Sequence, residues 1–130
     1  LDHFKRVNDS WGHEFGDKVL KAAAQVIQAG VRGTDLVARF GGEEFVLLLT
    51  HADIDTAGRV AQRIRVGISE AIDALPDGQR VTLSLGIVAC PLGSDLREAV
   101  MQADRQLYKA KEQGRDQVVV HDPTGSAAAA

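Results

Sequence analysis

Two adjacent carboxylates follow a pair of glycines in the segment 40–45, which reads Phe-Gly-Gly-Glu-Glu-Phe. Carboxylate oxygens are ligands that hard divalent cations prefer, and glycines leave room for a nucleotide to approach the backbone. Apolar runs flank the segment and predict two strands joined by a tight turn at Gly41 and Gly42. Glu43 and Glu44 would then lie at a hairpin tip and could hold a cation. A plain hairpin with a solvated acidic corner fits the same hexapeptide, so the choice depends on neighbouring motifs.

The hairpin must be positioned by the rest of the chain, in which strand and helix patterns are mixed. Alternating or continuous apolar runs predict strands over 36–40, 45–49, 81–89 and 118–120. Apolar residues at helical spacing predict three longer helices, which begin near Asp17, Asp53 and Asp95. A short helical turn is expected over 4–8. This order predicts an α+β fold with an antiparallel-rich central sheet and helices packed around it.

Composition indicates one ordinary globular domain. The chain has 130 residues, of which 45% are hydrophobic, and this is enough to bury a core. A formal charge of −3 provides no basic field for a nucleic acid polymer. The single cysteine, Cys90, cannot form an internal disulfide, and no stretch has the length and apolarity of a membrane span or a signal peptide. We expect a cytoplasmic domain without membrane contact, over residues 1–121, and a disordered tail over 122–130.

A series of short motifs runs in order along nearly the whole chain. The motifs are Phe4-Lys5, Asn8-Asp9, Gly12-His13, Gly16-Asp17, the glycine-glutamate segment 41–45, Ala103-Asp104, 107–111 and Gly114-Arg115. Together they strongly resemble the GGDEF family of diguanylate cyclases. The resemblance implies condensation of two GTP molecules into cyclic di-GMP and pyrophosphate. It also implies a fold similar to the ferredoxin-like palm domain of nucleotidyl cyclases and polymerases.

Joining two nucleotides requires a 3′-hydroxyl to attack an α-phosphate while pyrophosphate leaves. Negative charge accumulates on the phosphate oxygens, and a divalent cation can neutralise it. The resemblance assigns the catalytic segment to Gly41, Gly42, Glu43 and Glu44. It implies that Glu43 and the backbone carbonyl of Leu1 bind the metal, which would be Mg²⁺ or Mn²⁺.

The triphosphate needs other contacts, because the chain has no Walker A sequence. Backbone N–H groups at the start of the Phe4 turn could bind phosphate oxygens. By resemblance these belong to His3 and Phe4, and the matching cationic side chains are Lys5, Lys111 and Arg115. Each of these cations, taken alone, also fits a solvated surface position.

The guanine base offers N1–H and amino donors, which a carboxylate can accept, and an edge that a side-chain amide can satisfy. Asn8 and Asp17 fit these requirements, and by resemblance both contact the base. Asn8 could instead be a turn residue and Asp17 a helix N-cap. His13 is interpreted as structural, because the histidines show no metal-ligand spacing with a cysteine.

The segment 32–35, Arg-Gly-Thr-Asp, precedes the first strand of the hairpin. It matches an RxxD site at which many family members bind their product and are inhibited, and the matching residues are Arg32 and Asp35. Arg63 resembles a further contact of the same site. The alternative is a surface ion pair between residues three apart, worth a few tenths of a kcal/mol, on the order of 0.3.

Three functional classes compete: a diguanylate cyclase, a non-catalytic cyclic di-GMP receptor and a nucleotide-free interaction domain. Retention of both Glu43 and Arg32 favours the first. Leu1-Asp2 keeps only the second half of the family's Asp-x-Asp motif, and the family's first helix and strand are missing from the sequence. We therefore expect product binding with impaired turnover. The two-fold symmetry of the product predicts a transient or ligand-bridged homodimer.

Overall fold

The structure, a computed structural model, describes residues 1–121 and has an α+β fold, as expected. Its elements are α1 (Phe4–Trp11), α2 (His13–Gly30), β1 (Leu36–Gly41), β2 (Glu44–Leu48), α3 (Ile54–Ala71), β3 (Leu85–Val88), α4 (Leu96–Glu112) and β4 (Val118–His121). The tail predicted over 122–130 lies outside the described residues. No helix within residues 1–121 has both the length and the apolarity to cross a membrane.

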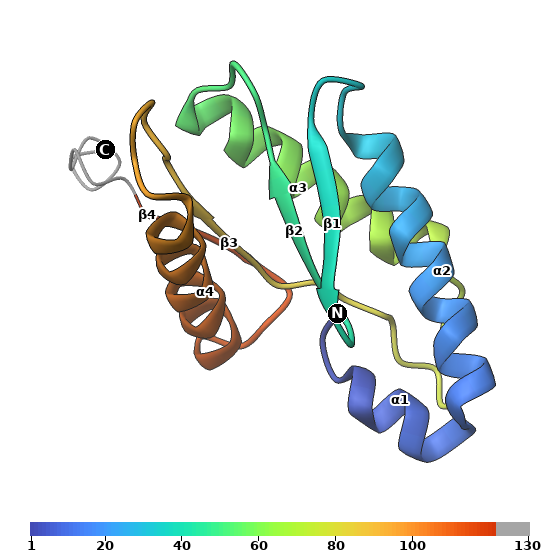
Figure 1. Cartoon of the computed structure of the whole chain (residues 1–130). Helices are drawn as coiled ribbons and strands as arrows, with labels where there is room; N and C mark the ends of the chain where they lie inside the picture. The colour runs from blue at the N-terminus through green and yellow to red at the C-terminus, as the bar shows by residue number, and fades with distance from the viewer. Residues whose placement is uncertain (122–130) are drawn as a thin grey trace.

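The described strands form two pairs instead of one continuous sheet (Figure 1). β1 and β2 are the predicted antiparallel hairpin, whereas β3 and β4 pair in parallel. The strand predicted over 81–89 is ordered as a strand only over 85–88, where β4 supplies a hydrogen-bonding partner. Before it, the Thr82 carbonyl oxygen accepts one hydrogen bond from the Asp2 N–H, at 3.0 Å. A segment is a strand only where it hydrogen-bonds to a neighbouring strand. The alternating pattern alone therefore predicted a strand that is too long.

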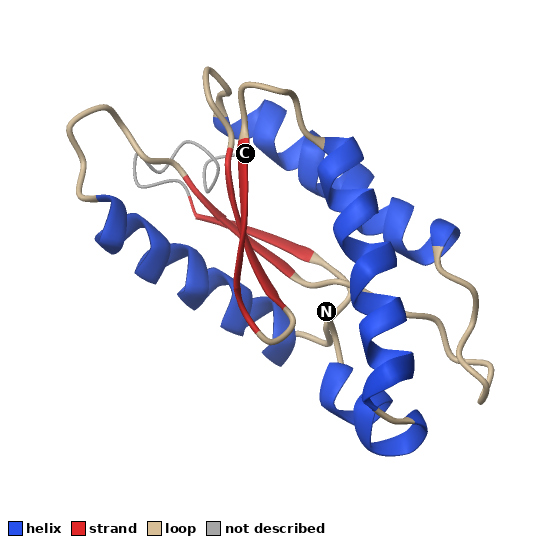
Figure 2. Ribbon diagram, turned by 45° about the vertical axis from the view of Figure 1, so that its right-hand side comes forward, coloured by secondary structure: helices blue, strands red, loops and turns tan. Residues whose placement is uncertain are grey.

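Helices cover both sides of the strands (Figure 2). α4 packs on β3 and β4 from one side, and α3 contacts the same strands from the other. Gly86 permits the close approach of α4, because a Cβ at this position would overlap the Ala103 carbonyl oxygen and the Leu107 nitrogen. The main core lies between the helices and the hairpin. Its buried members include Phe4, Val19, Leu20, Ala23, Ile27, Ile64, Ile68, Val81 and Leu83.

Two helix boundaries differ from the prediction at the N-terminal end. The turn predicted over 4–8 is the longer helix α1, and α2 begins at His13 with Gly12 as its N-cap. Asp17 therefore lies inside α2, and its alternative role as an N-cap is wrong. Gly12 has φ of 89°, which lets the chain reverse between the two helices within one residue.

The other two helix starts are confirmed. The Asp53 carboxylate caps α3 by accepting from the Thr56 N–H at 2.7 Å. The Asp95 carboxylate caps α4 by accepting from the Arg97 N–H at 3.0 Å. Leu96, an apolar residue in the first turn of this last helix, is 55% exposed.

Candidate nucleotide-binding site

The hairpin is present as predicted, but its turn is formed by Gly42 and Glu43 and not by Gly41 and Gly42, because Gly41 is the last residue of β1. Gly41 and Gly42 have φ of 128° and 52°, which glycine adopts without strain. Glu44 is the first residue of β2 and pairs with Gly41, so Glu43 lies in the turn itself. The Arg39 Nε donates to the Gly42 carbonyl at 2.9 Å and holds the turn against its own strand. Glu43 is half-buried and Glu44 exposed, so both carboxylates remain accessible to a ligand.

The first residue of the chain lies beside this turn. The Leu1 nitrogen donates to the Glu43 carbonyl oxygen at 3.1 Å, and Figure 1 shows the N-terminus next to the hairpin tip. The carboxylates of Asp2, Glu43 and Glu44 and the Lys111 ammonium all lie close enough to act electrostatically on this nitrogen. Four charged groups from three separate segments thus lie around the Leu1 nitrogen.

The start of α1 immediately follows. His3 is the N-cap residue in a left-handed conformation, with φ of 54°, and its side chain does not cap the helix. The first N–H groups of a helix have no partner within the helix, and they favour an anion. The first turn of α1 contains no acidic residue and contains Lys5, which is exposed. This helix start is therefore suited to phosphate oxygens.

The other predicted cations come from the opposite end of the chain. Lys111 lies in the last turn of α4 and Arg115 in the loop that follows. That end of α4 and its loop lie on the same side of the molecule as the hairpin tip (Figures 1 and 2). Within residues 1–121 the Arg115 guanidinium has no hydrogen bond or ion pair to another side chain or carbonyl.

Sequence reasoning missed the role of Asp2, which is only 6% exposed. Its carboxylate accepts from the Thr82 hydroxyl at 2.8 Å, the Ser84 hydroxyl at 2.6 Å and the Asp116 N–H at 3.1 Å. The carboxylate thus connects the start of α1, the segment before β3 and the Arg115 loop. Its partners are 80 or more residues away in sequence, so no local pattern indicates this network.

Asn8 meets Gly16, the residue before Asp17, where α1 packs on α2. The Asn8 side chain lies against Gly16, where an added Cβ would overlap the Asn8 Oδ1 atom. Gly16 is therefore required for the position of the amide. Asp17 follows directly, on an exposed part of α2. The structure brings the two segments together, which makes a shared contact to one base geometrically consistent.

The Arg32–Asp35 segment forms a hydrogen-bonded turn at the open end of the hairpin. The Asp35 side chain is only 3% exposed, whereas the Arg32 side chain is 59% exposed. Asp35 accepts from the backbone N–H groups of Arg32 and Thr50, both at 2.9 Å, and from the Thr50 hydroxyl at 3.3 Å. These backbone hydrogen bonds, first that of Arg32 and then that of Thr50, hold the pKa of Asp35 below its ordinary value of 3.8.

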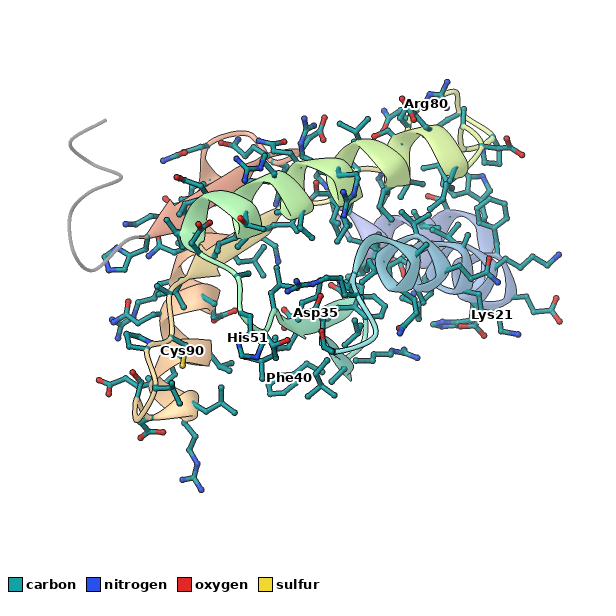
Figure 3. The ribbon with its side chains drawn as sticks, turned by 90° about the horizontal axis from the view of Figure 1, so that it is seen from above. Lys21, Asp35, Phe40, His51, Arg80 and Cys90 are labelled. Atoms are coloured by element: carbon teal, nitrogen blue, oxygen red, sulfur yellow. The ribbon has the colours of Figure 1, made fainter. Side chains whose placement is uncertain are left out.

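The expected i,i+3 ion pair is present but long, with 3.6 Å between the Arg32 Nε and the Asp35 Oδ2. The Arg32 guanidinium also donates to the Thr50 carbonyl oxygen. Arg63 of α3 donates to the Gly30 carbonyl at 2.9 Å, which brings a second guanidinium to the same corner. Viewed from above, Figure 3 shows Asp35 and His51 close together there, while Phe40 points outward from the hairpin.

Within residues 1–121, no three His, Cys, Asp or Glu side chains lie close enough together to bind a metal on their own. Mg²⁺ is commonly bound by one or two carboxylates together with substrate phosphates, so the Glu43 carboxylate and neighbouring backbone oxygens fit this type of site. His13 is exposed at the first position of α2.

Comparison with known proteins decides the family. Residues 1–117 match the family described as "Diguanylate cyclase, GGDEF domain". The chain belongs to the GGDEF family of diguanylate cyclases. A probable diguanylate cyclase of Escherichia coli, DgcT, is 44% identical over 126 residues, which are 94% of this chain and 28% of that protein. The chain thus spans less than a third of this relative's length.

Solved structures of GGDEF domains confirm the palm-like fold. The active GGEEF domain of a diguanylate cyclase from Vibrio cholerae matches 92% of this chain and 76% of that one, with 32% identity and a TM-score of 0.83. The GGDEF domain of DgcB from Caulobacter crescentus, in complex with c-di-GMP, matches 92% of this chain and 72% of that one, with 31% identity and a TM-score of 0.83.

Proposed function

We propose that this GGDEF domain condenses two GTP molecules into cyclic di-GMP and two pyrophosphates. The observation that carries the proposal is the meeting of Leu1, the Glu43 turn and the uncapped start of α1 at one point. A carboxylate for a cation and free N–H groups for phosphate are thus adjacent. Membership of the GGDEF family supports this chemistry.

In the proposed complex, the N–H groups of His3 and Phe4 and the side chains of Lys5, Lys111 and Arg115 bind the triphosphate. Asn8 and Asp17 bind the guanine edge. Glu43 and the Leu1 carbonyl would hold Mg²⁺ or Mn²⁺, which neutralises charge on the phosphates when bound. Glu44 adds a second carboxylate beside the reacting groups. The chain's residues fix the α-phosphate so that a 3′-hydroxyl from a second half-site can attack it, with pyrophosphate as the leaving group.

A product-binding site at the Arg32 corner is part of the same proposal. The DgcB domain from Caulobacter crescentus was solved with c-di-GMP, which supports binding of this ligand within the family. The exposed Arg32 guanidinium, with Arg63 nearby, is available to a guanine or phosphate oxygen. Asp35 already accepts from two backbone N–H groups, so its main effect is to hold the Arg32 turn in place.

Product analysis tests the catalytic part. The protein is incubated with GTP and Mg²⁺, and products are identified by mass. Cyclic di-GMP is expected, and Glu43→Gln should lower its rate of formation by about 100-fold, because a lost anionic ligand removes several kcal/mol of transition-state stabilisation. Glu98→Gln, which changes an exposed carboxylate in the first turn of α4, is the matched control and should not change the rate. Binding of cyclic di-GMP without any turnover would instead support a receptor.

A further inference from the structure

The loop that carries Arg115 has an unusual backbone. Gly114, Arg115 and Asp116 have φ of 116°, 65° and 46°, so three consecutive residues lie in the region that favours glycine. Left-handed conformations of non-glycine residues are strained and persist only where the surroundings fix them. Contacts elsewhere in the molecule must therefore hold Arg115 and Asp116 in this conformation.

Those contacts come from three other segments. The Arg115 N–H donates to the Ala110 carbonyl at 2.9 Å, and its carbonyl accepts from the Gln117 amide at 3.1 Å. The Asp116 N–H donates to the buried Asp2 carboxylate at 3.1 Å. The Asp116 carboxylate accepts from the Arg65 guanidinium of α3 at 2.9 Å.

The segment that contains Asp2 and the loop that contains Arg115 both belong to the proposed triphosphate site. Asp2 is the residue between Leu1 and His3, so its backbone belongs to the segment that would bind phosphate and metal. Its side chain holds the loop that presents Arg115. One buried carboxylate therefore fixes the distance between two phosphate-binding segments that are more than 100 residues apart in sequence.

We propose that Asp2, Arg65 and Asp116 are positioning residues that fix the Arg115 guanidinium for the triphosphate of the substrate. This inference rests on the proposed function, because it takes Arg115 as a triphosphate contact. Arg65 and Asp116 do not touch the nucleotide in this arrangement. They act by selecting one conformation of a strained loop whose arginine side chain has no other partner within residues 1–121.

Ligand binding to single and double variants tests the proposal. The ligands are a non-hydrolysable GTP analogue and guanosine, which lacks the phosphates. Arg115→Ala should weaken binding of the analogue about tenfold, as expected for a lost charge-assisted hydrogen bond, and leave guanosine binding unchanged. Arg65→Ala should weaken analogue binding by about fivefold, the upper range for an ion pair of this exposure, again without effect on guanosine.

The double variant distinguishes positioning from general destabilisation. If Arg65 acts through Arg115, Arg65→Ala should cause no further loss in the Arg115→Ala background. Arg65→Lys, which can still reach the Asp116 carboxylate, should restore most of the affinity. Asp116→Asn keeps the N–H donor but loses the charge, and should resemble Arg65→Ala. Asp77→Asn removes a comparable ion pair, 2.8 Å from Arg6, and serves as the control with unchanged affinity.

The possible outcomes separate the two proposals. If Arg115→Ala leaves analogue binding unchanged, the assigned triphosphate contact is wrong and the positioning role fails with it. If Arg115→Ala weakens binding but Arg65→Ala and Asp116→Asn do not, the proposed function stands and the positioning role alone is overturned. Equal losses for guanosine and for the analogue, or full additivity in the double variant, would also overturn it.

Discussion

At the scale of single residues, the structure excludes one of the two roles considered for Asp17, that of a helix N-cap. As an interior residue of α2, it is not needed to cap the helix, since Gly12 is at the N-cap. An exposed carboxylate beside the Asn8–Gly16 contact is free to bind a ligand. The proposed base contact of Asp17 therefore no longer competes with a role as helix N-cap.

Asp17→Asn is expected to weaken GTP binding by about tenfold and ATP binding much less. Guanine offers N1–H and amino donors to the carboxylate, and adenine has neither, so only the guanine complex loses a charged acceptor. Calorimetric titration with both nucleotides measures the difference. Asp55→Asn, on α3, is the control, and an equal loss for GTP and ATP would exclude a role of Asp17 in base recognition.

Arg32→Ala is expected to weaken binding of cyclic di-GMP by about tenfold, because an exposed guanidinium can form charge-assisted bonds to the ligand. Arg59→Ala removes an exposed arginine from α3, whose side chain donates to the Thr56 hydroxyl at 3.3 Å, and should leave the affinity unchanged. Calorimetry with purified cyclic di-GMP provides the measurement. Unchanged affinity in the Arg32 variant would contradict the proposed product site.

The stability of the Arg32 turn should depend on pH through Asp35. Hydrogen bonds from Arg32 and Thr50 lower the pKa of the folded carboxyl below 3.8. The stabilisation is therefore fully present above the unfolded pKa and is lost as pH falls through the folded pKa. The protection of the Thr50 amide, measured as its exchange rate relative to that of an unstructured peptide at the same pH, should fall below about pH 4 in the native protein. In Asp35→Asn the exchange should already be faster at neutral pH, and an unchanged rate would argue against this role.

At the scale of elements, helix positions depend on glycines that allow close approach. α4 presents Lys111 and the Arg115 loop, and its backbone lies directly on Gly86 of β3. The position of this helix is thus set by a residue without a side chain. The same reasoning applies to Gly16, which lets α1 and its Asn8 amide approach α2.

Gly86→Ala should destabilise the fold by about 1–3 kcal/mol, because the new Cβ would overlap backbone atoms that cannot rotate away. Gly58→Ala, in α3, places its Cβ where no atom lies within 4 Å and should be stabilising by about 0.5–1 kcal/mol. Denaturant unfolding of both variants measures the difference. Similar free energies of unfolding for the two variants would show that α4 shifts without cost.

At the scale of the whole molecule, the expected assembly follows from the proposed reaction. Each GTP supplies one 3′-hydroxyl and one α-phosphate, and the product has two-fold symmetry, so two half-sites must face each other. Exposed large apolar residues such as Phe40, Met101 and Tyr108 are spread over separate elements, β1 and α4. This distribution does not resemble the continuous apolar centre of a stable homodimer interface.

Sedimentation should therefore find the domain monomeric alone and partly dimeric with a non-hydrolysable GTP analogue. The ligand would supply contacts that the protein surfaces lack. Guanosine, without phosphates, is the matched control and should promote less association. A tight dimer without any ligand would contradict this expectation.

Much of the fold was predicted from the sequence because the relevant forces are local. Two apolar runs around a glycine pair predicted the hairpin, helical spacing predicted the longer helices, and the helix starts at Asp53 and Asp95 were identifiable. The ordered motifs indicated the family, which the comparisons confirmed. The assignments of individual site residues remain predictions that the experiments above can test.

Only the tertiary structure decided how distant segments combine. The length of the strand within 81–89 depended on where its partner strand lies. The role of Asp35, which precedes β1, depended on Thr50, which follows β2. The Asp2 network joins residues 2, 82, 84 and 116, and the burial of its carboxylate exists only after these segments meet. Hydrophobic periodicity specifies which face of an element is buried. It carries no information on which distant hydrogen-bond donor will reach a particular carboxylate, because that depends on the packing of the whole chain.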